Sequence, residues 1–361
     1  MIMAYPRRGL SVAAAAAALV LASCATPEPE PAPPPPPPPP PPAVSLNEGV
    51  AQAASIYVAF MREAGSISAG FDSAEAIQAA IRKGASYEPA QLSRGMIAYG
   101  SILALQSPEF VQGVRTYAVD PAQRQQMIAR ILADPATAAT FPGAAAAAGL
   151  IVDTIGRDSA AMLLIAEAVE EDAYTIQGRG DPRRRWATVH ISDRVTRLEG
   201  AKSLSAVQML PSAEESARLF AAANSGSGLG MGSARSGPPY TPAVVRSLAV
   251  AALAALGAGG EDGRANTEAL TVEQNSEFCL NMSKLMLFQC LAASRPSYED
   301  MFCVGRHVAR DLATCTAQNI TPAPVEAPQT AVAGGAPEQT PVAAEAAAVS
   351  TAATAALNNG G

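Results

Sequence analysis

Four cysteines in the last third of the chain constrain its fold more than any other feature of the sequence. They lie in one segment, at Cys279, Cys290, Cys303 and Cys315. The residues on either side of Arg295-Pro296 have helical periodicity, and the dipeptide predicts a turn between two helices. We therefore expect an antiparallel helical hairpin, in which residues at equal sequence distances from the turn lie at equal heights.

The distances from the turn favour one of the three pairings that four cysteines allow. Cys290 and Cys303 lie about six and seven residues from it, and Cys279 and Cys315 about seventeen and nineteen. The nested pairing, Cys279–Cys315 and Cys290–Cys303, therefore fits best. Eleven residues place Cys279 and Cys290 on one helix face, but the twelve from Cys303 to Cys315 leave them about 120° out of phase.

The layout is similar to twin-cysteine helical hairpins, which place nine residues between the cysteines of each helix; here ten and eleven intervene. Zinc sites usually contain a close cysteine pair, and redox sites a Cys-x-x-Cys motif. Neither occurs here, although His307 lies one helical turn after Cys303 and keeps a metal site open as an alternative. We predict structural disulfides, no metal and no cofactor.

The first 24 residues predict the compartment in which these disulfides would form. Arg7 and Arg8 precede an uncharged apolar run that is too short to span a membrane. The run ends in Leu21-Ala22-Ser23-Cys24, which resembles the cleavage site of bacterial lipoproteins. The resemblance implies a signal peptide at residues 1–23 and a lipid on the thiol of Cys24. An ordinary signal peptide with a chance cysteine is the alternative.

Lipidation of Cys24 implies attachment to a lipid bilayer without a transmembrane helix, because two or three acyl chains anchor a protein stably. In Gram-negative lipoproteins an aspartate after the cysteine favours retention at the inner membrane, and here that residue is Ala25. The resemblance therefore favours the outer membrane, facing the oxidising periplasm. Anchoring in the inner membrane and exposure at the cell surface stay open.

Composition narrows the fold and the partners. Loss of residues 1–23 removes two of 25 basic residues and none of 32 acidic ones, which changes the net charge from −7 to −9. An acidic chain of this kind is a poor partner for nucleic acid. Abundant alanine and only 5% aromatic residues favour helices. We predict an all-α protein with an irregular multi-helix body and a disulfide-linked hairpin.

Proline- and alanine-rich ends frame this body. Ten consecutive prolines from Pro33 predict a stiff polyproline spacer, and the last forty residues have too little large apolar surface to fold. The predicted segments are a signal peptide at 1–23, a lipidated cysteine and linker at 24–44, a helical domain at 45–260 with a loop at 225–240, a four-cysteine hairpin at 261–320, and a disordered tail at 321–361.

Capping signals and prolines locate the helices of the body. Capping boxes begin at Ser45 and Asp72, and three prolines suit first helical turns, namely Pro89, Pro108 and Pro121. Further helices are expected around 151–169, 214–223 and 243–256, the last one buried. Gly149 and Gly156 argue against one unbroken helix there, and residues 186–191 alternate weakly, as in a short strand.

Few residues are candidates for catalysis or ligand binding. The two histidines are His190 and His307, and His190 lies near Ser192 and Asp193, although sequence neighbours do not establish a catalytic triad. One basic cluster predicts an anion-binding patch for phosphate or carboxylate groups of envelope polymers; it consists of Arg183, Arg184, Arg185, Arg194 and Arg197. The alternative is a solvated face balanced by the acidic residues at 170–172.

One stretch faintly resembles the first motif of lytic transglycosylases. Glu215-Ser216 is followed by a glycine-rich run, and in that family the glutamate acts as general acid and base on a glycosidic bond. The family motif continues Gly-Leu-Met-Gln, whereas residues 228–231 read Gly-Leu-Gly-Met. The missing glutamine puts the resemblance in doubt.

The predicted function follows from the anchor, spacer, helical body and cross-linked hairpin. We expect a non-enzymatic, membrane-anchored lipoprotein that faces the periplasm and acts as a structural or interaction module of the cell envelope. Its expected partners are the bilayer, through Cys24, and envelope proteins or peptidoglycan. The alternative is a peptidoglycan-active enzyme of lytic-transglycosylase type that uses Glu215.

Overall fold

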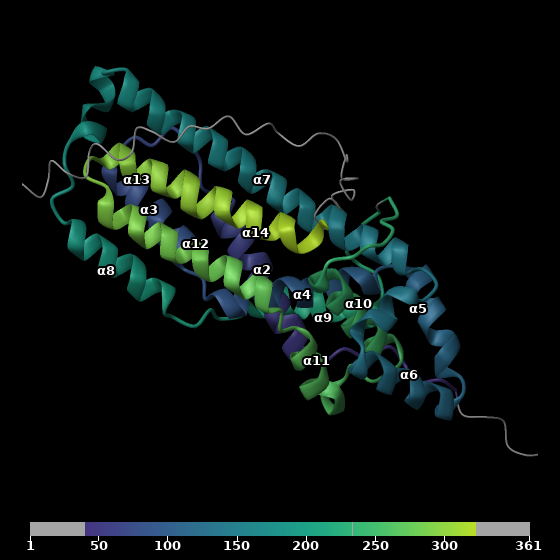
Figure 1. Ribbon diagram of the computed structural model, residues 1–361. Coiled ribbons are helices and arrows are strands. Elements are labelled where there is room, and N and C mark those ends of the chain that lie inside the picture. The colour runs from purple at the N-terminus through teal and green to yellow at the C-terminus, as the bar shows by residue number, and fades with distance from the viewer. Residues whose placement is uncertain (1–39, 233, 323–361) are drawn as a thin grey trace, which may run out of the picture.

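The computed structural model describes residues 40–232 and 234–322, and within these ranges every extended element of secondary structure is helical (Figure 1). The predicted all-α fold is confirmed. The signal peptide, Cys24, most of the linker and the tail lie outside the described residues. No described helix is both long and apolar enough to cross a membrane.

The helices follow one another with short connections. The α-helices of the body are α2 (Glu48–Ala64), α3 (Ala74–Ala85), α4 (Pro89–Leu105), α5 (Pro108–Arg115), α6 (Pro121–Ala133), α7 (Ala144–Gly178), α8 (Arg194–Ser205), α9 (Ala213–Ser225) and α10 (Pro242–Ala255). The C-terminal part contains α11 (Arg264–Leu270), α12 (Gln274–Ala293), α13 (Ser297–Val304), the π-helical stretch η6 (Gly305–Arg310) and α14 (Asp311–Ile320). The 3₁₀ turns are η2 (Thr116–Ala118), η3 (Pro135–Thr140), η4 (Pro182–Thr188) and η5 (Glu261–Gly263).

The helices that were expected to begin at prolines do so, whereas two helices begin later than their predicted caps. The three prolines that begin α4, α5 and α6 occupy first turns, as predicted. The N-caps of α2 and α3 are Asn47 and Ser73, one or two residues later than the sequence suggested. Asn47 replaces Ser45 because its side chain accepts from Val50 N–H and also donates to Gly259 O at 2.8 Å. A distant segment therefore decided this cap.

Helix α7 is one unbroken helix of 35 residues, contrary to the interruption expected at Gly149 and Gly156. It runs along the molecule, and α4, α13, η6 and α14 pack against it (Figure 1). Packing of this kind outweighs the weak helix propensity of two glycines.

The strand expected at residues 186–191 is wrong. The 3₁₀ turn η4 covers the first half of it, and in the second half His190 forms an isolated bridge with Pro296. No described strand lies beside it to form a sheet. Ile191 N–H instead donates to Arg295 O at 2.9 Å, which fastens this segment to the turn of the hairpin.

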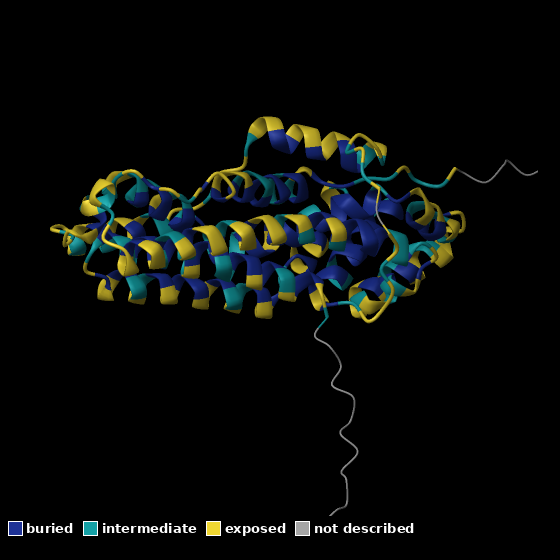
Figure 2. Cartoon of the chain, turned by 90° about the horizontal axis from the view of Figure 1, so that it is seen from above, coloured by how far each residue is buried: buried dark blue, intermediate teal, exposed yellow. Residues whose placement is uncertain are grey.

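Helix α10 lies in the core. All but a few side chains of this helix are buried, as predicted, and it packs against α4, η3, α7 and α5. Figure 2 shows that the helices have buried dark-blue faces on the inside and exposed yellow faces on the outside. The expected loop at 225–240 connects α9 to α10. Helix α9 ends at Ser225, and its C-cap Gly226 lies in the left-handed region with a φ of 66°.

The hairpin shares this core. Helix α12 runs antiparallel to the continuous rod of α13, η6 and α14, and the pair packs on α7, α4 and α8. Buried residues of the hairpin, among them Leu280, Leu287 and Leu312, belong to the same apolar cluster as α10. The boundary expected near residue 260 therefore does not separate two cores.

Candidate functional site

The four cysteines form two disulfides in the nested arrangement. Cys279 bonds to Cys315 and Cys290 to Cys303, with Cα–Cα distances of 5.7 Å in both. This is the pairing that the spacing from the turn predicts.

The π-helical stretch η6 resolves the phase mismatch between Cys303 and Cys315. It lies between these two residues, and π-type i→i+5 bonding inserts about one extra residue into a helical turn. One residue corresponds to about 100° of rotation, which nearly cancels the 120° expected for a straight α-helix. Both sulfur atoms of the second helix can therefore face α12.

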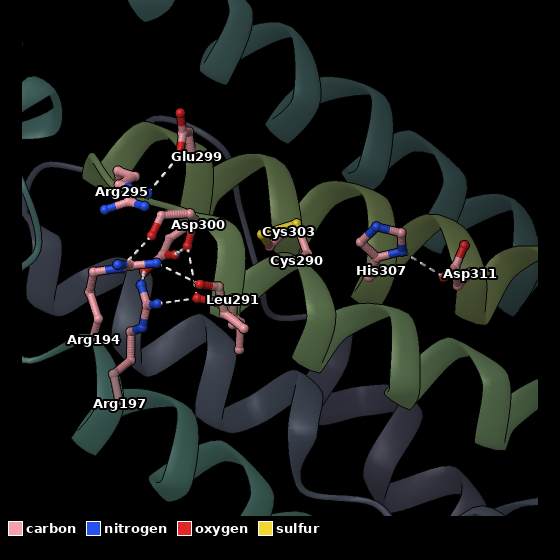
Figure 3. Close-up of a disulfide and its surroundings, with 12 residues drawn as sticks. Arg194, Arg197, Cys290, Leu291, Arg295, Glu299, Asp300, Cys303, His307 and Asp311 are labelled. Atoms are coloured by element: carbon pink, nitrogen blue, oxygen red, sulfur yellow. Dashed lines mark hydrogen bonds and ion pairs between the residues drawn. A yellow bond between two sulfur atoms is a disulfide. The ribbon is translucent and has the colours of Figure 1, made fainter. Parts of the chain in front are cut away.

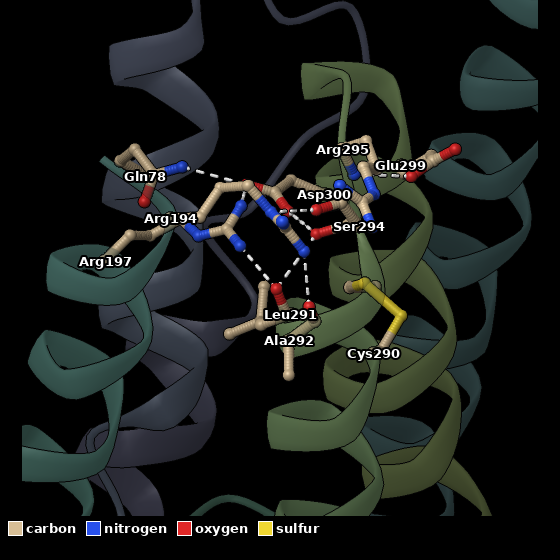
Figure 4. A network of polar contacts seen from close by, with 11 residues as sticks. Gln78, Arg194, Arg197, Cys290, Leu291, Ala292, Ser294, Arg295, Glu299 and Asp300 are labelled. Atoms are coloured by element: carbon tan, nitrogen blue, oxygen red, sulfur yellow. Dashed lines mark hydrogen bonds and ion pairs between the residues drawn. A yellow bond between two sulfur atoms is a disulfide. The ribbon is translucent and has the colours of Figure 1, made fainter. Parts of the chain in front are cut away.

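Two arginines of α8 hold the turn of the hairpin (Figures 3 and 4). Arg194 donates through Nε to Ser294 O at 2.7 Å and also bonds Ala292 O. Arg197 donates to Leu291 O. These carbonyls end α12 and have no partner within the helix, so the two guanidinium groups satisfy them and meet the negative end of the helix dipole.

The second partner of Arg197 is the buried carboxylate of Asp300. The Asp300 side chain also accepts from Ser294 Oγ at 2.6 Å and from Gln78 Nε2 at 3.0 Å. Burial raises the pKa of Asp300, and these hydrogen bonds and the charge of Arg197 oppose the rise. The network joins α3, α8 and both helices of the hairpin.

The predicted anion-binding patch is not one surface. Arg194 and Arg197 are bonded within the fold, and Arg184 pairs with Asp172 and donates to Phe71 O at 3.1 Å. Arg183 pairs with Asp181, and Arg185 is exposed. The correction has a physical reason: α8 turns its arginines toward the carbonyls of α12, a contact across about 100 residues that charge clustering does not reveal.

Glu215 has the wrong environment for a general acid. Its carboxylate is largely buried and pairs with Arg62 at 3.1 Å and with Arg218. Burial opposes ionisation, but the hydrogen bonds and charges of Arg218 and Arg62 prevail, and the pKa of Glu215 is lowered. A glycosidase acid needs a raised pKa, so this geometry fits an ion triad between α2 and α9.

The histidines lie in different places. His190 lines a cavity of about 660 Å³, together with Trp186, Ser192 and Asp193. No hydrogen bond among the described residues joins His190 to that serine or aspartate. His307 contacts Asp311 at 3.0 Å. The metal alternative at Cys303 is not formed, because its sulfur is in a disulfide, and the described residues contain no group of three metal-ligating side chains.

An exposed apolar stripe on α12 is the feature that sequence reasoning missed. The stripe consists of Phe278, Met282, Leu285 and Met286, which are 66, 38, 46 and 39% exposed. The opposite face, with Leu280, Leu287 and Leu291, is buried. The sequence of α12 gives only a weak signal, because its large apolar residues are spread over both faces, as they also are in a core helix.

The charged residues of α12 do not lie free in the stripe. Lys284 is buried; it donates to Tyr87 O and to Ser205 O at 3.1 Å, and burial lowers its pKa to about 8. Glu277 pairs with Arg94 at 3.6 Å, and the N-cap Glu273 accepts from Ser276 N–H at 2.6 Å. The stripe is therefore an uncharged surface on a cross-linked helix.

The role of this surface cannot be taken from similar proteins. No family model, no curated protein and no solved structure matches the chain. The candidate site is therefore defined by its own geometry: a hairpin held by two disulfides and a buried ion pair, with an apolar helix face turned to solvent.

Proposed function

We propose that the protein is a lipid-anchored, periplasm-facing lipoprotein that acts as a structural or interaction module of the cell envelope. The observation that carries this proposal is the stripe on α12. Contiguous exposed apolar surface marks sites of protein interaction. The disulfides hold the helix in place before a partner arrives, so binding does not have to order it.

The two ends of the molecule suit this role. The described chain starts beside α10, where Arg115 donates to Pro42 O at 2.8 Å. The turn of the hairpin lies at the opposite end of the molecule (Figure 1). A chain attached through Cys24 and the proline-rich linker would thus present the hairpin away from its attachment point.

Membrane fractionation tests the anchor. We expect Cys24→Ser to release the protein from membranes, because the hydroxyl cannot carry the thioether-linked lipid. Ser23→Ala keeps a small residue before the cysteine and is the matched control that should stay in the membrane fraction. Retention of Cys24→Ser in membranes would contradict the lipid anchor.

Site-specific photo-crosslinking in intact cells tests the interaction surface. A crosslinking residue in place of Met286 should give a discrete protein adduct. The same residue in place of Leu164, which is 68% exposed on α7, is the control for apolar exposure alone. If position 286 gives no adduct, or if both positions give the same ones, the stripe is not an interaction surface.

A further inference from the structure

We propose that one water molecule is bound inside the protein, where it bridges Ser93 of α4 and Ser276 of α12 and joins the hairpin to the body. The site is a small cavity between these two helices and α14, on the buried side of α12. Helices α4 and α14 both pack against α12 (Figure 1). The cavity is separate from the exposed stripe, and its occupant does not depend on what the stripe binds.

Two buried hydroxyl groups in this cavity lack a partner. Ser93 and Ser276 are both 0% exposed, and both line the cavity. Among the described residues, neither hydroxyl oxygen has a hydrogen-bond partner. Burial of a hydroxyl without a hydrogen bond is costly, and the large majority of buried polar side-chain atoms in folded proteins are satisfied. Both serines therefore need a partner that the described chain does not supply.

Neighbouring side chains show that the two serines lie on adjacent helix segments. Arg94 directly follows Ser93, Glu277 directly follows Ser276, and Arg94 Nε lies 3.6 Å from Glu277 Oε1. The beginnings of α4 and α12 are thus side by side. A small molecule in the cavity between them can reach both hydroxyl groups.

The size and the lining of the cavity select water over an ion or a larger ligand. A water-sized sphere has about 10 Å³ of free volume there, which is close to what a single water requires. All the residues that line the cavity are buried, and none of them carries a charge at neutral pH. An ion would lose its hydration shell without gaining a charged partner.

Helix α14 offers the water a third partner. Thr316 and Asn319 also line the cavity, and both are buried. Asn319 Nδ2 donates to Cys315 O at 2.7 Å, and no described residue donates to the amide oxygen of Asn319. Buried waters typically make about three hydrogen bonds. One water therefore links α4 of the body to both helices of the hairpin.

Crystallography of the mature full-length chain with Cys24→Ser tests the water directly. We expect one peak of electron density within hydrogen-bond distance of Ser93 Oγ and Ser276 Oγ. The peak should be absent when Ser93→Ala and Ser276→Ala are combined. A cavity without a peak, or two hydroxyl groups that are bonded to backbone carbonyls instead, would overturn the proposal.

Urea denaturation tests whether one water couples the two helices. Ser93→Ala and Ser276→Ala should each raise the equilibrium constant of unfolding about 5-fold, because each variant leaves the other hydroxyl without its bridge. Independent sites would multiply to about 25-fold in the double variant. We expect the double variant to stay well below that product, because both hydroxyl groups share one water.

Ser101→Ala is the matched control. Ser101 is another fully buried serine of α4, but its hydroxyl donates to Ala98 O at 2.7 Å within its own helix. Its effect should multiply with that of Ser276→Ala, since the two side chains share no partner. If the effects of Ser93→Ala and Ser276→Ala multiply in the same way, no water bridges them and the proposal is wrong.

Discussion

The two ends of this molecule hold their helices together by different means. Around α10, small apolar side chains pack closely: five of its alanines are fully buried, and Gly100 of α4 lies so near that an added Cβ would come within 2.5 Å of Ser247 Oγ. At the hairpin end, two disulfides, the Arg197–Asp300 pair and buried Lys284 connect the helices.

The difference follows from how much of each helix is covered. Helix α10 is surrounded and gains stability from burial on all sides. Helix α12 has one apolar face in solvent, so burial stabilises it from one side only. Disulfides and ion pairs compensate for the smaller stabilisation of α12 by burial. A helix can therefore keep a binding face exposed when other bonds fix its position.

The largest effect is expected at the buried ion pair. Arg197→Met leaves the Asp300 carboxylate without its counter-charge, and we expect the free energy of unfolding to fall by about 3–5 kcal/mol in urea denaturation. Arg183→Met is the matched control; this side chain is 90% exposed and its loss should change stability by less than about 0.5 kcal/mol. Equal effects of the two variants would show that the buried ion pair does not stabilise the hairpin end.

Loss of the outer disulfide should have the next largest effect. Cys279 and Cys315 close a loop of 36 residues, so Cys279→Ala with Cys315→Ala should lower the free energy of unfolding by about 3–4 kcal/mol. Amide hydrogen exchange should rise in α12 and α14 and stay slow in α10. Equally faster exchange in α10 would show that the two ends unfold as one unit.

A smaller, pH-dependent effect is expected at Lys284. Burial lowers its pKa from 10.5 to about 8, with the charge of Glu88 opposing the shift. Between these values the unfolded chain binds more protons than the folded one, so stability rises with pH across this window. Relative to Lys284→Met, the wild type should gain about 2 kcal/mol from pH 7 to pH 10.

Denaturation of both proteins at several pH values measures this gain. The difference between them isolates Lys284 from Tyr87 and Tyr99, whose raised pKa values act in the opposite direction above pH 10. A difference that does not vary with pH would show that the Lys284 amine is not held in a desolvated site.

The smallest effect is expected in the stripe. Leu285→Ala should change the unfolding free energy of the monomer by less than about 0.5 kcal/mol, because this side chain is half exposed. Leu287→Ala, on the buried face of the same helix, should lower it by about 2–5 kcal/mol. Similar losses would mean that the outer face of α12 is packed like the inner one.

Local signals in the sequence predicted the parts of the fold that depend on neighbours along the chain. Prolines located the starts of α4, α5 and α6, and equal distances from Pro296 selected the nested disulfides. The 120° mismatch between Cys303 and Cys315 argued against an ideal straight helix, but only the structure located the π-helical stretch that corrects it. The first inference uses the fixed φ and missing N–H of proline, and the second uses helical rise, so both depend only on neighbouring residues.

Contacts between distant segments decided the rest. The cap at Asn47 depends on Gly259, and the roles of Arg194 and Arg197 depend on carbonyls about 100 residues away. The candidate surface belongs to this class, since large apolar residues occur on both faces of α12 and its sequence does not say which face is buried. Local rules specify where helices begin and how their faces are spaced, but burial is a property of the assembled molecule, and only packing left Phe278, Met282, Leu285 and Met286 in solvent.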